Sequence, residues 1–99
     1  MANYRLTNKA VEDLNSIWEY TFNKWSQAQA DKYYNLLLSR CEEIAKNPNI
    51  GRIYDTITDE LYGLKSDKHI IFYRISVFKS IEITRILHQK MDLKNRMLE

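Results

Sequence analysis

The sequence predicts an α+β fold in which an N-terminal antiparallel helix hairpin packs on an antiparallel sheet of three to four strands. Two observations carry this prediction. Apolar residues in the first half recur every three or four positions, the period of an amphipathic helix, whereas from residue 61 onward they form short runs rich in Ile, Val, Phe, Tyr and Thr. A chain of 99 residues that is 44% hydrophobic is long enough for one domain, residues 1–99, and too short for two.

The chain opens with a short alternating segment, Tyr4 to Leu6, which we interpret as an edge strand. Thr7 or Asn8 can then cap a helix, because a side-chain oxygen at that position accepts a hydrogen bond from an otherwise unpaired backbone N–H. We expect this helix over about residues 8–23. The residues that recur at three- and four-residue spacing, and so make the helix amphipathic, are Ala10, Val11, Leu14, Ile17, Trp18, Thr21, Phe22 and Trp25.

A second helix is predicted immediately after the first. Ser26 and Gln29 have the spacing of a capping box, in which each side chain satisfies a backbone N–H of the other residue. The apolar stripe continues to about residue 46, and Pro48 ends the helix because it disfavours the helical conformation at Asn47. A linker of about three residues forces the two helices into an antiparallel hairpin over residues 8–46.

Three consecutive strands are expected over residues 61–66, 69–77 and 80–88, and residues 53–60 are either a loop or an irregular extended segment. The connections at residues 67–68 and 78–79 are short enough only for antiparallel pairing. Arg85 shares its parity with the apolar residues Ile83 and Leu87. Either a bulge therefore lies near residues 84–86, or Arg85 lies on a face that is only partly dry. The tail, residues 91–99, can form one or two helical turns that begin at Asp92.

The charge of the chain is uneven. Residues 1–64 contain seven Lys/Arg and nine Asp/Glu, whereas residues 65–90 contain six Lys/Arg and two Asp/Glu. This basic segment is either a solvated face or a surface for phosphate or an acidic partner. The N-terminus lacks the apolar segment of a signal peptide, and the longest apolar run, residues 70–73, is far below the roughly 20 residues that span a bilayer. We therefore expect a soluble cytoplasmic protein with no membrane partner.

Few residues are suited to catalysis or metal binding. Cys41 is the single cysteine, which excludes an internal disulfide, and its position on a helical face predicts a buried small hydrophobe. His69 and His88 are the only histidines, too few for a recognisable metal site, so no metal or cofactor is expected. His88 and Arg85, together with a carboxylate such as Glu60, could in principle perform acid/base chemistry on a phosphodiester. No nucleotide-binding or hydrolase motif is present.

Several short motifs, in order and spacing, resemble the ParE branch of the RelE/ParE toxin superfamily. The sharpest is R-I-L-H-Q-K-M-D at residues 85–92. The others are Tyr4-x-Leu6-Thr7, the helix face Ala10-x-x-Asp13-Leu14-x-x-Ile17, N-P-N-I-G-R at residues 47–52 and H-I-I-F-Y at residues 69–73. Together they cover residues 4–92, nearly the whole chain.

The resemblance implies a toxin of a type II toxin–antitoxin system, with a helix hairpin packed on an antiparallel sheet. ParE-like toxins inhibit DNA gyrase by stabilising its cleaved-DNA complex, and a cognate ParD-like antitoxin neutralises them. The resemblance therefore implies a hetero-oligomer with the antitoxin, gyrase with its cleaved DNA as a second partner, and a protein that is not itself an enzyme.

The alternative is the RelE branch, whose members cleave mRNA on the ribosome. This sequence departs from that pattern: Ile70 follows His69 where the nucleases often have an Arg, and Gln89 follows His88 where they have a Tyr. The basic and aromatic C-terminal run of the nucleases is reduced to Lys94 and Arg96. If the chain were nonetheless a ribonuclease, Arg85 and His88 would be its catalytic residues; otherwise no catalytic residue is expected.

Two sets of contact residues follow from this resemblance. The predicted gyrase contacts are the basic and exposed-looking residues of the last strand and tail: Arg85, His88, Lys90, Met91, Asp92 and Arg96. The antitoxin is expected in the groove between the helix hairpin and the sheet, where aromatic side chains anchor it and cations pair with its acidic segment. The predicted antitoxin contacts are Trp18, Trp25, Tyr33, Arg52, Tyr54, Lys65, Tyr73 and Arg74.

Overall fold

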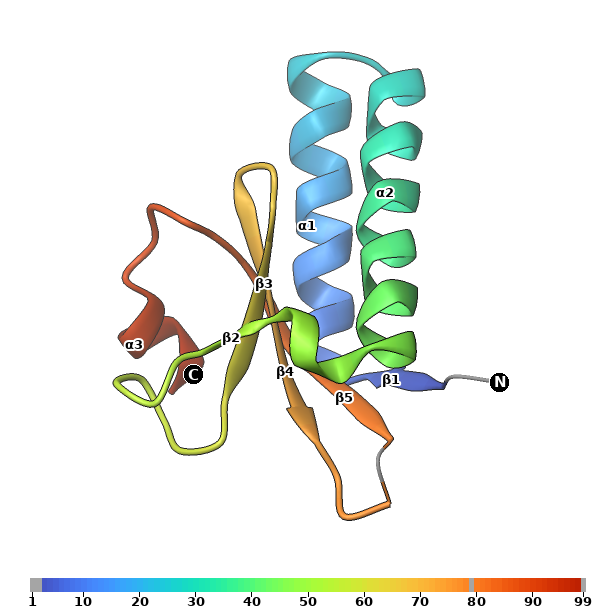
Figure 1. Ribbon diagram of the computed structural model, residues 1–99. Helices are drawn as coiled ribbons and strands as arrows, with labels where there is room; N and C mark the ends of the chain where they lie inside the picture. The colour runs from blue at the N-terminus through green and yellow to red at the C-terminus, as the bar shows by residue number, and fades with distance from the viewer. Residues whose placement is uncertain (1–2, 79, 99) are drawn as a thin grey trace.

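The computed structural model describes residues 3–78 and 80–98 (Figure 1). Lys79 in the predicted turn and Glu99 at the end of the predicted tail lie outside the described residues, as do Met1 and Ala2. The elements in chain order are β1 (Tyr4–Leu6), α1 (Asn8–Lys24), α2 (Gln27–Lys46), a 3-10 turn η1 (Pro48–Ile50), β2 (Arg52–Ile53), β3 (Tyr62–Ser66), β4 (His69–Ile75), β5 (Ile81–His88) and α3 (Leu93–Met97). The predicted α+β class is confirmed.

The helix hairpin is defined by two side-chain caps. The Thr7 hydroxyl accepts a hydrogen bond from the Ala10 N–H, and the Ser26 hydroxyl accepts one from the Gln29 N–H, each at 3.1 Å. Both bonds satisfy a backbone donor that has no partner within its helix. Only Trp25 and Ser26 separate α1 from α2, so the helices run antiparallel side by side (Figure 1).

The sheet has five strands in the order β1-β5-β4-β3-β2. The prediction of three to four antiparallel strands is corrected in two respects. The sequence does not assign a structure to residues 53–60. In the structure this segment begins within a two-residue edge strand, β2, which pairs antiparallel with β3. At the other edge β1 pairs parallel with β5, with Tyr4 opposite Ile81, so the sheet is mixed.

A β-bulge in β5 explains the unusual parity of Arg85. Phe72 pairs with Arg85, but the next residue, Tyr73, pairs with Ile83, so Thr84 is the extra residue. A bulge reverses the alternation of faces beyond it. Ile83 and Ile86 therefore both belong to the core on the helix side of the sheet. The predicted bulge is confirmed.

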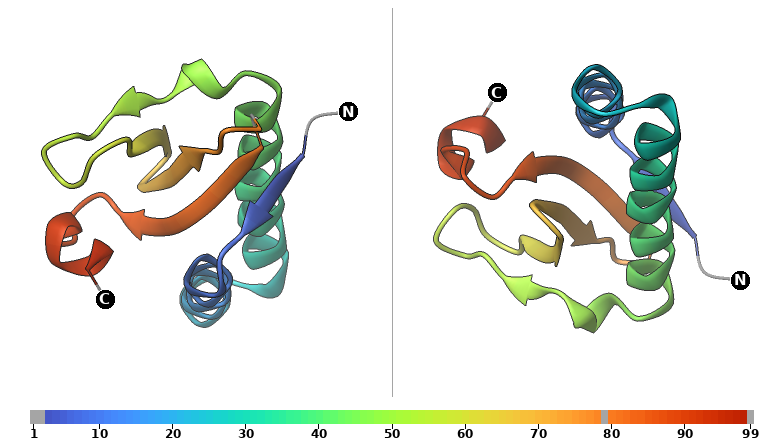
Figure 2. Two further views of the ribbon diagram at one scale, coloured as in Figure 1. Left: turned by 90° about the horizontal axis from the view of Figure 1, so that it is seen from below. Right: turned by 90° about the horizontal axis from the view of Figure 1, so that it is seen from above.

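Apolar clusters cover both faces of the sheet. On one face α1 and α2 supply side chains such as Leu14, Leu37 and Cys41. Burial raises the pKa of the Cys41 thiol to about 12, in keeping with a small core hydrophobe. On the opposite face lies a smaller cluster, against which Leu93 and Met97 of α3 pack. Figure 2 shows α3 on the side of the sheet away from the helix hairpin. Its buried members are Leu61, Ile70, Phe72 and Leu87.

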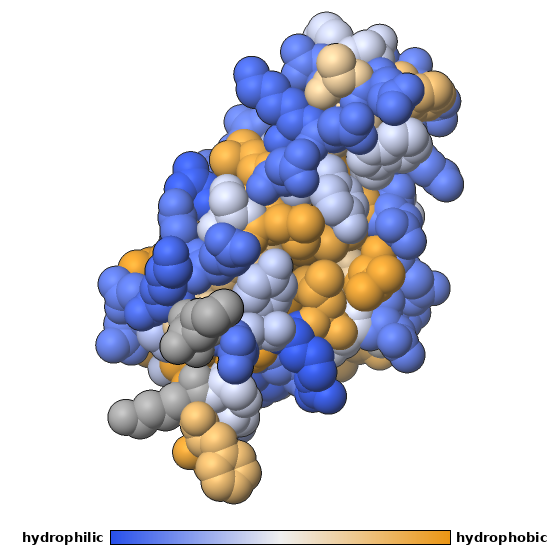
Figure 3. Space-filling view, turned by 90° about the vertical axis from the view of Figure 1, so that its right-hand side faces the viewer, coloured by the Kyte–Doolittle hydropathy of each residue, from blue (hydrophilic) through white to orange (hydrophobic). Residues whose placement is uncertain are grey.

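Apolar side chains also reach the surface of the hairpin, among them Val11, Phe22 and Leu36. Viewed from the side of α2, the molecule is apolar in the middle of the face and hydrophilic along its margins (Figure 3). Within the described residues, no helix is both long and apolar enough to cross a membrane. The helices are therefore amphipathic, with their most deeply buried side chains toward the sheet.

A candidate binding groove between the helix hairpin and the sheet

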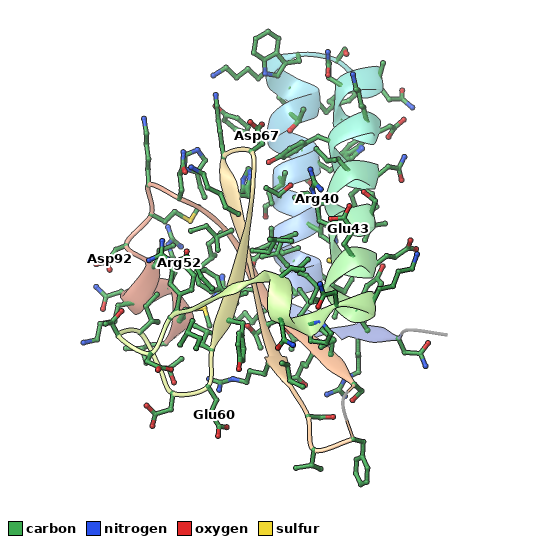
Figure 4. The ribbon with its side chains drawn as sticks, viewed as in Figure 1. Arg40, Glu43, Arg52, Glu60, Asp67 and Asp92 are labelled. Atoms are coloured by element: carbon green, nitrogen blue, oxygen red, sulfur yellow. The ribbon has the colours of Figure 1, made fainter. Side chains whose placement is uncertain are left out.

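An open groove of about 910 Å³ lies where α1 and the start of α2 meet the end of the sheet at which β4 begins and β5 ends. We call it the hairpin–sheet groove. Asp67, in the β3–β4 turn beside the helices, marks its position (Figure 4). One wall is formed by α1, with Tyr20, Lys24 and Trp25. The opposite wall is formed by the β3–β4 turn, the end of β5 and the tail.

The base of the groove is held by an ion pair between α1 and β5. Arg85 donates to the Asp13 carboxylate through Nε at 2.8 Å and Nη2 at 3.0 Å, a two-pronged geometry. Both side chains are largely buried, with 9% and 14% of the Arg85 and Asp13 side chains exposed. A paired, hydrogen-bonded geometry of this kind is how a buried charge is tolerated.

The strand topology places Asp13 beside β5. β1 ends at Leu6, so β5 lacks a neighbouring strand beyond the Thr7–Ile83 hydrogen bond. At this bare edge the N–H of Ile86 donates to the Asp13 carboxylate at 3.0 Å. Asp13 thus replaces a missing strand as well as pairing with Arg85.

Arg85 is consequently not the exposed cation expected from the sequence. The whole residue is 8% exposed, and its Nη1 donates to the backbone carbonyl of Arg96 in the tail. Glu60 lies in a different hollow, with Arg74 and Ser76. The predicted combination of Arg85, His88 and Glu60 as an acid/base group is therefore not assembled.

A second cluster in the groove joins α2 to the two central strands. The Tyr33 hydroxyl lies 2.6 Å from His69 Nδ1, and the His69 and His88 rings meet edge to face with centroids 5.3 Å apart. Burial, then the neighbouring His88, lowers the pKa of His69 to about 4. Burial raises the pKa of Tyr33 to about 12. Near neutral pH both side chains are therefore uncharged, and the Tyr33 hydroxyl donates to the Ser66 carbonyl at 3.4 Å.

The predicted gyrase contacts separate into two groups. His88, Lys90, Met91 and Arg96 line the groove with Arg85. Met91 is 41% exposed. Asp92 instead caps α3: its side chain accepts from the Asn95 N–H at 3.4 Å, and it lies on the side of the sheet away from the helices (Figure 4).

The predicted antitoxin contacts do not form one surface. Trp25 and Tyr33 line the groove, and Trp25 is 69% exposed. Trp18 is on the hairpin, where it stacks on Phe22 and donates from Nε1 to Asp31 at 2.9 Å. None of these three belongs to the fully buried core.

Tyr73 was wrongly expected at the interface. It is fully buried, donates from Oη to the Pro48 carbonyl at 2.6 Å and accepts from the Gly51 N–H at 3.0 Å. These two hydrogen bonds connect the segment after α2, residues 48–51, to strand β4 in the middle of the sheet. The Tyr73 hydroxyl explains how an aromatic with a polar end can be a core residue.

The other four predicted antitoxin contacts lie outside the groove. Arg52 lies on the side of the sheet away from the helices (Figure 4), over the Tyr54 ring and 5.4 Å from its centroid. Tyr54 packs edge-on against Phe72 in the cluster on that face. Arg74 donates to the Asp59 carbonyl at 2.7 Å. Lys65 is exposed on β3. The expectation that these four share the groove with Trp25 is wrong.

Several groove residues were not among the predicted contacts, and Tyr20, Lys24 and Lys68 are the ones that carry a positive charge or an exposed ring. Tyr20 and Lys24 are four residues apart on α1, so they share one helix face, and Trp25 follows directly. The four-residue spacing in the sequence could have indicated that Tyr20 and Lys24 lie on the same face of the helix. Lys68 belongs to the basic segment that the sequence leaves as either a solvated face or an anion-binding surface. The Gln89 N–H donates to the Lys68 carbonyl at 2.9 Å, which holds the turn beside the end of β5.

Metal binding finds no support among residues 3–78 and 80–98. No three His, Cys, Asp or Glu side chains come together there in a group that could hold an ion. The described groove is instead built from cations, imidazoles and aromatic rings. These groups suit recognition of an anionic or amphipathic ligand.

Comparison with known proteins agrees with the sequence motifs. A family model described as "ParE toxin of type II toxin-antitoxin system, parDE" matches residues 4–93. Toxin ParE1 of Mycobacterium tuberculosis (strain CDC 1551 / Oshkosh) is 34% identical over 94 residues, which cover 95% of this chain and 96% of that protein. Toxin ParE1 of Caulobacter vibrioides (strain ATCC 19089 / CIP 103742 / CB 15) is 35% identical over the same shares of the two chains.

Solved structures share the fold. A chain from the chromosomal ParDE TA system from P. aeruginosa has a TM-score of 0.77 at 20% identity, covering 89% of this chain and 96% of that one. A chain from the toxin–antitoxin complex RelBE2 from Mycobacterium tuberculosis has a TM-score of 0.69 at 14% identity, covering 89% and 98%. The fold, the motifs and the match over residues 4–93 lead to one conclusion: the chain belongs to the ParE toxin family of type II toxin–antitoxin systems.

Proposed function

We propose that this toxin inhibits DNA gyrase by stabilising the cleaved-DNA complex, and that a cognate ParD-like antitoxin neutralises it in a hetero-oligomer. The observation that carries the proposal is the composition of the hairpin–sheet groove. It gathers the recognition residues His88, Lys90 and Met91, whereas Arg85, the cation that a ribonuclease mechanism would use, is occupied by Asp13. This arrangement supports binding rather than catalysis.

Inhibition of this kind requires only differential binding. A ligand that prefers the cleaved, open state over the resealed state by about 3 kcal/mol shifts their ratio by roughly 150-fold. The groove offers an exposed apolar side chain, Met91, beside the cation Lys90. Such a combination can provide both contact area and orientation.

The same groove is our proposed antitoxin site. Trp25 and Tyr33, predicted as antitoxin contacts, line it together with His88 and Lys90, predicted as gyrase contacts. An antitoxin segment in the groove would cover the target-binding residues directly. Neutralisation then follows from competition for one surface. The solved neighbours come from ParDE and RelBE toxin–antitoxin assemblies, which supports an antitoxin partner.

The deciding experiment combines the purified toxin with gyrase, ATP and supercoiled plasmid, followed by quenching with detergent and protease. Accumulation of linear DNA is expected, and prior addition of antitoxin should abolish it. If no linear DNA forms and supercoiling is unaffected, the proposal is wrong. Cleavage of mRNA on translating ribosomes then tests the RelE-type alternative.

Point variants test the surface without removing the tail, because α3 packs Leu93 and Met97 against the sheet. A variant with both Lys90→Ala and Met91→Ala is expected to lower linear-DNA formation at least about 10-fold, the effect of losing about 1.4 kcal/mol of binding. Lys94→Ala is the matched control, because Lys94 is exposed on α3 and lies outside the groove. Equal effects in the double variant and the control would reject this surface.

A further inference from the structure

One side of the hairpin–sheet groove is a cationic edge. Lys68 in the β3–β4 turn and Lys90 after β5 both line the groove, and the Gln89 N–H bond to the Lys68 carbonyl holds the two segments together. Both lysines are exposed, and neither has an ion pair within the described residues. Their ammonium groups are therefore available to an anionic ligand.

Two imidazoles line the groove close to these cations: His69 follows Lys68 in sequence, and His88 precedes Lys90 by two residues. The His88 Nδ1 accepts from the Lys90 N–H at 3.1 Å, and an imidazole that accepts at Nδ1 has its proton at Nε2. The His88 ring thus offers an Nε2–H donor, and it meets the His69 ring in edge-to-face contact.

The opposite side of the groove is aromatic. Tyr20 is 63% exposed and Trp25 is 69% exposed, both unusually open for large aromatic side chains. The Lys24 ammonium lies 5.5 Å from the centre of the Tyr20 ring and 3.1 Å from its hydroxyl. Lys24 thereby adds a cation to the rim of this wall.

The net charge distinguishes this groove from a second hollow, which lies beside β1. The hollow beside β1 contains Arg5 and Arg74 but also Glu60 and Glu82, which cancel. In the hairpin–sheet groove five cations face two carboxylates, a formal balance of plus three: Lys24, Lys68, Arg85, Lys90 and Arg96 against Asp13 and Asp67.

We propose that the hairpin–sheet groove binds a nucleic-acid strand directly. Its phosphodiester groups would lie along Lys68, Lys90 and the His88 Nε2–H donor, and its bases would stack on Tyr20 and Trp25. A cationic track opposite exposed aromatic rings is the arrangement that proteins use for single strands. A polyglutamate peptide, which has no ring to stack, would use the cations alone. This inference goes beyond gyrase inhibition, because it assigns the toxin a contact with nucleic acid itself.

Fluorescence anisotropy with the full chain tests the inference without gyrase. The probes are labelled 12-nucleotide dT and U strands and a 12-base-pair DNA duplex, titrated between 50 and 200 mM salt. Wild type is expected to bind a strand with salt-dependent affinity. Combining Lys68→Ala with Lys90→Ala should reduce the slope of log K against log salt by about 1.4, since each phosphate contact on a single strand contributes about 0.7. Combining Tyr20→Ala with Trp25→Ala should weaken binding at least about 10-fold.

The matched control combines Lys9→Ala with Lys46→Ala, two exposed lysines outside the groove that remove the same charge. It is expected to leave the slope nearly unchanged. The inference is overturned if wild type binds no probe at 50 mM salt or if the control loses as much affinity as the Lys68 and Lys90 pair. It is also overturned if a 12-residue polyglutamate peptide binds more tightly than every nucleic acid. Strand binding with a negative gyrase gel would reject the proposed function alone.

Discussion

The carboxylate of Asp13 on α1 holds the guanidinium of Arg85 on β5 in a two-pronged ion pair and also accepts the N–H of Ile86. Three structural units meet here, because Arg85 also donates to the Arg96 carbonyl in the tail. A residue that looked like a contact for a partner is therefore an internal brace. It sets the position of both walls of the groove.

Removal of the Asp13 carboxylate should be strongly destabilising. Asp13→Ala removes the carboxylate that neutralises the buried guanidinium of Arg85. Removal of one partner of a buried ion pair typically lowers the free energy of unfolding by about 3–5 kcal/mol. The control is Glu43→Ala, which breaks the exposed Arg40–Glu43 pair and should cost at most about 0.5 kcal/mol (Figure 4). Urea unfolding monitored by circular dichroism compares the two. Equal losses would contradict the role of Asp13 as a brace.

The Tyr73 hydroxyl makes a second testable contribution. Tyr73→Phe removes the donor to the Pro48 carbonyl and the acceptor for the Gly51 N–H, and should lower the free energy of unfolding by about 1–3 kcal/mol. Tyr20→Phe, which removes an exposed hydroxyl, should change it by less than about 0.5 kcal/mol. Thermal and urea unfolding check both values. If Tyr73→Phe left the free energy of unfolding unchanged, the two hydrogen bonds of the hydroxyl would not stabilise the fold.

His69 predicts a specific pH dependence of stability. Its pKa is about 4 in the folded chain and about 6.5 when unfolded, so the unfolded state gains a proton first as the pH falls. The contribution of neutral, buried His69 to the free energy of unfolding is therefore fully present above pH 6.5, and it is lost progressively as the pH falls from 6.5 to 4. Urea unfolding of wild type and His69→Gln at pH 7, 5.5 and 4.5 measures it. The difference between the two proteins should shrink as the pH falls, and a constant difference would refute the assignment.

Glu60 has a left-handed backbone, with φ at 58° in an exposed loop that the Tyr54 N–H bond to the Leu61 carbonyl closes. Glycine adopts this conformation without the steric cost of a Cβ. Glu60→Gly should therefore raise the free energy of unfolding by up to about 1 kcal/mol. Glu12→Gly, on the exposed face of α1, should lower it by about 1 kcal/mol. Thermal melts of both variants test the opposite signs, and a destabilised Glu60→Gly would overturn the prediction.

Local patterns predicted the parts of the fold that depend on neighbours in sequence. Ser26 lies three residues before Gln29, so its cap could be read directly, and the N–H of Gln29 does donate to it. The disturbed alternation around Arg85 indicated either a bulge near residues 84–86 or a partly dry face, and the structure has the bulge, at Thr84. One extra residue there shifts every later side chain to the other face.

Contacts between distant residues could not be read in this way. Nothing near Arg85 in sequence indicates that its partner is Asp13, 72 positions earlier. Tyr73 was placed at the interface because a polar aromatic suits either a core or a surface, and only the position of Pro48 decides between them. The two-residue strand β2 has too few residues to show alternation. The candidate site was accordingly predicted only in part.

The parallel pairing of β1 with β5 has a consequence for synthesis of the toxin. Tyr4 lies opposite Ile81, so β1, the first strand of the sheet to be synthesised, cannot pair until β5, the last strand, has been made. Helix contacts are local and can form early, whereas this edge closes only when residues up to 83 have emerged. A chain that stops before residue 81 therefore lacks the β1–β5 edge, and the groove beside β5 forms only after its lining residues up to Arg96 have been synthesised.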